Sequence, residues 1–138
     1  MPLPLPGSPT RDGFLSGFLL EDDHARVLLV LDEVRDLAAR IAADPALQGC
    51  DLLIAQCGWF ERDPSGEPLV GQDSPLWANV ANFERDTLPL IAAARAGRAL
   101  LTHLSDIHGR TPDEFETLAT TLAPLAVQFA YDGLTLEL

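Results

Sequence analysis

Basic residues are scarce in this sequence. Nine Lys and Arg residues stand against 21 Asp and Glu, which gives a formal net charge of −12 and an isoelectric point near 4.3. Proteins that bind nucleic acid contact phosphates through clustered Lys and Arg. The composition therefore excludes nucleic acid as a general partner.

Long apolar runs are also missing. No run approaches the roughly 18 apolar residues that a membrane-spanning helix needs, so we expect no membrane contact. The opening "MPLPLPGSP" has no basic segment followed by an apolar one, so no signal peptide is predicted. We expect residues 1–12 to form a disordered, proline-rich tail before one domain at residues 13–138.

Cysteine is limited to Cys50 and Cys57. Their C-x6-C spacing fits no common zinc or redox motif. Because they flank or lie in the apolar run "CDLLIAQC", we expect buried free thiols and a reducing, cytoplasmic location. A chain of 138 residues buries roughly two thirds of its unfolded surface, so neither a disulfide nor a metal is required for stability.

Hydrophobic patterning predicts a mixed α/β (α+β) fold. Short apolar runs predict strands at residues 16–21, 25–32, 50–57, 98–103, 127–131 and 134–138. The last two would form a hairpin around an Asp-Gly turn. Helical spacing predicts helices at residues 34–42, 82–96 and 112–122. This order favours one mixed sheet with its helices packed on one face.

Local end signals mark the two later helices. Thr111, Pro112 and Glu114 form a capping box before an apolar face, which is a strong start signal. Gly97 would end the helix at 82–96, whose regular part we expect to start near Thr87 because Pro89 follows. The polar stretch 58–77 is long for a loop, which favours a mobile or functional segment.

Asp32 and His103 are the best candidates for a site. Each ends a predicted buried strand, and functional groups gather where such strands end. Carboxylate and imidazole are good ligands for zinc, manganese or iron. Alternatively, Asp32 caps the next helix and His103 bonds to backbone.

The other candidate residues carry weaker signals. His108 lies in the polar stretch "DIHGR" and His24 in a predicted turn, so both favour solvent exposure. Ser105 is too close to His103 in sequence to form a nucleophile and base pair, and no G-x-S-x-G motif is present. No phosphate-binding glycine loop is present either.

The motif order resembles the C-terminal half of the metallo-β-lactamase fold. The four motifs, in order, are "GFLLE…RVLLVLDE", "DLLIAQC", "RALLTHLSD" and "VQFAYDGLTLEL". The resemblance covers roughly residues 16–138. The nearest branch is that of the phosphoribosyl cyclic phosphodiesterases and their ribonuclease Z-like relatives. The resemblance implies half of an αββα sandwich.

The same resemblance implies a metal-dependent phosphodiesterase. Asp32 matches the carboxylate that bridges two metals, zinc or manganese, and His103 matches the last histidine ligand. Asp132-Gly133 matches the Asp-Gly strand pair on which the family's chain finishes. The two metals would activate a water for in-line attack on a small phosphodiester. The acidic composition argues against the RNA-processing branch.

Several family residues are not found here. The H-x-H-x-D-H motif belongs to an N-terminal half that this sequence does not contain. The stretch "LWANVANF" has Trp77, Asn79 and Asn82 where the family's proton-donating histidine is expected, and Glu33 follows Asp32 where a small hydroxylated residue is usual. His108 is a weak substitute for the donor.

Two hypotheses follow. In the first, the chain is a metal-dependent hydrolase completed by a separate N-terminal half and inactive alone. In the second, it is a non-catalytic half-domain that serves as a binding or structural module. A lone half would expose an apolar sheet face, so both predict a partner, either the missing half or a second copy.

Overall fold

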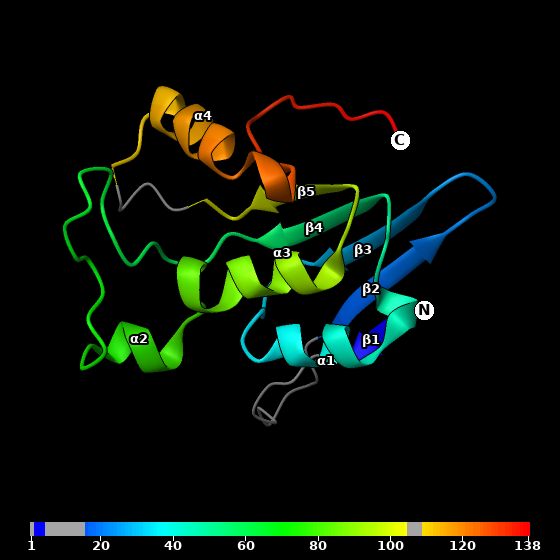
Figure 1. The fold of residues 1–138 in the computed structure, drawn as a ribbon, viewed down its shortest axis with the longest axis horizontal. Coiled ribbons are helices and arrows are strands. Elements are labelled where there is room, and N and C mark those ends of the chain that lie inside the picture. Colours follow the sequence, from blue (N-terminus) through cyan, green and yellow to red (C-terminus); the bar gives the residue numbers. More distant parts are fainter. Residues whose placement is uncertain (1, 5–15, 105–108) are drawn as a thin grey trace.

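The computed structural model describes residues 2–4, 16–104 and 109–138. They form one mixed sheet with helices, which confirms the predicted fold class (Figure 1). The strands are β1 (Pro2–Pro4), β2 (Ser16–Glu21), β3 (Arg26–Val30), β4 (Leu52–Gln56), β5 (Arg98–Thr102) and β6 (Val127–Phe129).

The strands lie side by side in sequence order. The short β1 pairs antiparallel with β2, and β2 pairs antiparallel with β3 as the predicted hairpin. From β3 to β6 every pairing is parallel. Part of the segment 1–12 that was expected to be a disordered tail, Pro2–Pro4, is thus the strand β1.

The helices connect the parallel strands. They are α1 (Leu37–Ala43), α2 (Pro75–Asn79), a π-helical turn (Phe83–Thr87) that leads into α3 (Leu88–Ala94), and α4 (Pro112–Thr121). Short 3-10 turns occupy Pro45–Leu47 and Ala123–Leu125. In the described part of the chain, none of the helices combines the length and apolar character that a membrane span requires.

The core lies on one side of the sheet. Helices α1 and α3 pack against each other over it, and α4 packs beside β6 (Figure 1). Alternate strand residues point into this core, together with apolar residues of the helices; the strand residues are Leu28, Val30, Leu53, Ala55, Ala99, Leu101, Val127 and Phe129. Their neighbours along each strand point to the opposite face.

Helix α1 begins three residues later than the sequence predicts. The carboxylate of Glu33 accepts a hydrogen bond from the backbone N–H of Arg35 at 2.8 Å, which holds this segment in a turn. Asp36 then has a left-handed backbone with φ of 57°. Regular helix follows from Leu37.

The helix predicted at 82–96 has a wider first turn and a different end. The N–H of Leu88 bonds to the carbonyl of Phe83, a π-type contact that precedes Pro89. A proline ring clashes with the carbonyl four residues before it in a regular α-helix, and the wider turn changes that spacing. At the other end Arg95, not Gly97, has the left-handed backbone, so the predicted glycine cap is wrong. A Cβ on Gly97 would lie 3.1 Å from the carbonyl oxygen of Asp51, which explains the glycine.

The predicted C-terminal hairpin is only half correct. The turn forms, because the N–H of Leu134 bonds to the carbonyl of Tyr131 and Gly133 has a positive φ of 86°. The segment 134–138 is not a strand. Instead, the guanidinium of Arg98, at the start of β5, donates to the carbonyl of Glu137. This contact places the segment near β5 rather than along β6.

The capping box of α4 gives a direct stability test. The Thr111 hydroxyl accepts from the N–H of Glu114, whose carboxylate accepts from the N–H of Thr111 at 2.7 Å. We expect Thr111→Ala to lower the free energy of unfolding by about 1 kcal/mol in urea titrations. Thr117→Ala, which removes only a hydroxyl bonded within the helix, should change it by less than about 0.5 kcal/mol. Equal losses in the two variants would contradict the capping role.

Candidate functional site at the carboxyl ends of the parallel strands

The structure brings Asp32 and His103 to the same edge of the sheet. Val30 of β3 is level with Ala55 of β4, and Ala55 is level with Leu101 of β5. Asp32 and His103 each lie two residues beyond this level. Because β4 lies between β3 and β5, the two strands that lead to these residues run about 10 Å apart.

Both residues are exposed, and His103 has an unusual backbone. His103 directly follows β5 and has a φ of 59°, in the left-handed region that non-glycine residues seldom occupy. Such conformations cluster at functional sites, where surrounding structure holds them in place. Asp32 does not cap α1, because Asp36 is the N-cap residue, so the part of the alternative that concerns Asp32 is wrong.

Glu33, beside Asp32, is committed to a structural ion pair. It is only 8% exposed, and its carboxylate accepts from Nε and Nη2 of Arg35, the latter at 2.6 Å. This hydrogen bonding raises the pKa of the Arg35 guanidinium. Arg35 also donates to the carbonyl of Ala78 in α2. Through Arg35, Glu33 therefore connects the segment after β3 to α2. Its carboxylate is not free to act as a third metal ligand beside Asp32 and His103.

Two other buried acids also have structural partners. The Glu61 carboxylate accepts from the backbone N–H groups of Glu84 and Arg85, both at 2.9 Å, which caps the π-helical turn. The Asp86 carboxylate accepts from the N–H of Asn82 at 2.7 Å and from the Arg85 side chain. Neither carboxylate is therefore available to a ligand without loss of these bonds.

The stretch where the family's donor histidine is expected has structural roles as well. Asn82 is fully buried, and its amide donates to the carbonyl of Val80 at 2.9 Å. Its Oδ1 atom has no hydrogen-bond partner. Trp77 packs its ring against the guanidinium of Arg85, 4.7 Å from the ring centroid, and Asn79 is exposed. His108 lies outside the described residues, so its role stays a prediction.

The described residues alone do not fit a metal centre. Within residues 2–4, 16–104 and 109–138, no group of three or more His, Cys, Asp and Glu side chains could hold a metal ion. Asp32 and His103 make two candidate ligands, whereas a catalytic zinc has three from protein. Any complete metal site at this edge requires ligands from another chain or from residues outside those described.

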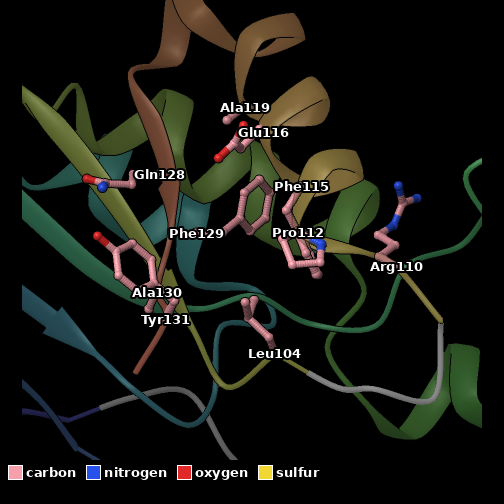
Figure 2. Close-up of a pocket in the computed structure, with 10 residues that line it drawn as sticks. All are labelled: Leu104, Arg110, Pro112, Phe115, Glu116, Ala119, Gln128, Phe129, Ala130 and Tyr131. Atoms are coloured by element: carbon pink, nitrogen blue, oxygen red, sulfur yellow. The ribbon is translucent and has the colours of Figure 1, made fainter. Parts of the chain in front are cut away.

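Sequence reasoning did not predict a groove between α4 and β6. It has a volume of about 640 Å³, and Figure 2 shows its lining. The rings of Phe115 and Phe129 lie together in it, with centroids 4.9 Å apart. Leu104, which also lines it, directly follows His103, so the groove adjoins the edge described above. Helical spacing gave the position of Phe115 but not the gap, which depends on how α4 packs.

Both cysteines are buried free thiols, as predicted. Burial is the main cause that raises the pKa of Cys57 to about 12, and burial also raises the pKa of Cys50. The thiolate is the reactive form of cysteine. Neither residue is placed to act as a nucleophile near neutral pH.

Thiol reactivity tests this assignment. A raised pKa lowers the thiolate fraction at pH 8, so neither cysteine should react rapidly with an aromatic disulfide reagent in the native protein. Both should react in urea, because unfolding removes the burial that raises the pKa of Cys57 to about 12. One fast native thiol at pH 8 would contradict the burial.

The strained backbone at His103 can be measured. Side chains disfavour the left-handed region by about 1–2 kcal/mol relative to glycine. We therefore expect His103→Gly to unfold at higher urea than His103→Ala, by about 1 kcal/mol in free energy. At Thr102, which is in regular strand, the order should reverse because glycine weakens strands. A His103→Gly variant no more stable than His103→Ala would show that no strain is held there.

Comparison with protein-family models, with curated proteins and with solved structures found no match to this chain.

Proposed function

We propose that this chain is one half of a metal-dependent hydrolase of the metallo-β-lactamase type, inactive without a second half. One observation carries the proposal: Asp32 and His103 lie level at one edge of a mixed sheet whose core-forming helices cover a single face. The same two residues match the family's ligand positions in order and context. Of the fourth motif, the Asp132-Gly133 turn after β6 is present, whereas the strand expected after it is not.

The missing ligands would come from an N-terminal half that carries H-x-H-x-D-H. Asp32 and His103 would supply the remaining carboxylate and imidazole for zinc or manganese. Because the described residues do not complete a metal site, we derive no catalytic step for this chain alone. His108 stays the weak candidate for a proton donor.

The substrate class that fits best is a small phosphodiester. A net charge of −12 opposes the long phosphate backbone of RNA more strongly than a small diester with one charge. Two buried free thiols support a cytoplasmic location, where thiols stay reduced.

A second candidate is a non-catalytic binding or structural module. It is favoured because each buried acid of the described residues, Glu33, Glu61 and Asp86, is held by backbone or arginine donors. In this case Asp32 and His103 would be relics of an ancestral site.

Activity assays separate these candidates. We expect the purified chain to hydrolyse no bis(4-nitrophenyl) phosphate above background, with or without added Zn²⁺ or Mn²⁺. Co-expression with an N-terminal half that carries H-x-H-x-D-H should restore turnover. His103→Ala in this chain should then abolish the restored turnover.

His24→Ala, in the exposed turn between β2 and β3, is the matched control and should leave restored turnover unchanged. Turnover by the chain alone that is lost in His103→Ala would overturn the claim of incompleteness. No turnover in any combination would favour the module.

A further inference from the structure

Helix α4 leaves the groove beside β6 open because its apolar face is not fully buried. Helices α1 and α3 each bury two or more apolar side chains, whereas α4 buries none. Phe115 and Ala119 of α4 are half-buried, and both line the groove together with the buried Phe129 of β6 (Figure 2). The space between helix and sheet can therefore accept a further apolar group.

The composition of the lining is typical of a pocket for a small molecule. The groove volume of about 640 Å³ lies within the range of roughly 300–1,000 Å³ that such pockets have. Most of the lining is apolar or aromatic, and Arg110, Glu116 and Gln128 are the charged or amide side chains in it. Pockets for small ligands combine apolar walls with a few polar groups in this way.

Arg110 brings a positive charge to the groove without an acidic partner. Its guanidinium lies 4.2 Å from the ring centroid of Phe60, and its Nη2 atom donates to the carbonyl of Arg62 at 3.1 Å. The buried Nε atom has no hydrogen-bond partner. Among the described residues, the ion pairs join other arginines, and none includes Arg110. In a chain with 21 acidic residues, this half-buried cation is left for an external anion.

A carboxylate is the anion that suits this guanidinium. It can accept from two N–H groups of one arginine at once, and such charge-assisted hydrogen bonds are stronger than neutral ones. Glu116 also lines the groove, but it is exposed, so water screens its charge. Arg110 is half-buried against aromatic rings, where an opposite charge interacts more strongly.

We propose that the groove between α4 and β6 binds a small aromatic carboxylate. The carboxylate pairs with the Arg110 guanidinium, and the aromatic body lies against Phe115 and Phe129. The centroids of these two rings lie 4.9 Å apart and their planes are tilted by 47°, so a third ring can extend the cluster. Neither Asp32 nor His103 lines the groove, so this site does not depend on the proposed hydrolase function.

The probe is 2-naphthoate, which has two fused rings and one carboxylate. With about 13 non-hydrogen atoms at ordinary ligand efficiency, it should bind with a dissociation constant on the order of 0.1–1 mM. The neutral amide 2-naphthamide has the same shape and the same rings. It measures how much of the binding is due to charge.

Titration of the full chain, followed by backbone amide NMR, tests the proposal without any metal. Naphthoate should shift the amide signals of groove residues such as Ala119 and Ala130. Naphthamide should bind about tenfold more weakly, because it lacks the charge-assisted hydrogen bonds to Arg110. In Arg110→Gln the two probes should bind within about twofold of each other. This ratio of dissociation constants reports the charge contact even if the substitution changes the shape of the groove.

Ala119→Phe tests the location, because the added ring fills the groove and should weaken naphthoate binding at least tenfold. Thr120→Phe is the matched control: Thr120 is the next residue of α4, is exposed and does not line the groove, so affinity should stay unchanged.

Three results would overturn the proposal. They are no binding of naphthoate at about 2 mM, equal binding of naphthoate and naphthamide to the unsubstituted chain, and equal effects of Ala119→Phe and Thr120→Phe. None of these results bears on turnover, so the hydrolase proposal is tested separately.

Discussion

The constraint that governs this structure is that its sheet is covered by helices on one face only. Strands β3 to β6 follow one another in sequence and are all parallel. Crossovers between neighbouring parallel strands are right-handed, so connections that all step in the same direction place their helices on the same side. The core therefore forms on that side of the sheet.

The same constraint creates the candidate site. Parallel strands end at one edge, so Asp32 and His103 both lie at this edge although 71 positions separate them in the sequence. The acids nearby, Glu33 and Glu61, fix the loops through backbone and arginine donors. The edge therefore carries two exposed side chains on a fixed framework, which suits half of a site.

The elements with strong local signals are predictable from the sequence. The capping box predicted α4, and continuous apolar runs predicted β4 and β5, because these signals depend on residues close in sequence. Features that depend on contacts between residues far apart in the sequence are not predictable in this way. Position 97 is glycine because a Cβ there would come too close to the backbone carbonyl of Asp51. The C-terminal segment is held by a hydrogen bond from Arg98 to Glu137 and does not pair with β6. The partners of Glu61 lie 23 and 24 residues away, which no local pattern encodes.

Molar mass and metal content, measured on one chromatographic sample, test the central claim that the chain is half of a larger unit. The account predicts that the 14.9 kDa monomer fraction contains far less than one zinc or manganese per chain. Any stoichiometric metal should elute with a larger assembly that another chain completes. A monomer that holds one tightly bound metal, lost in His103→Ala, would contradict the account, because the chain would then complete its own site.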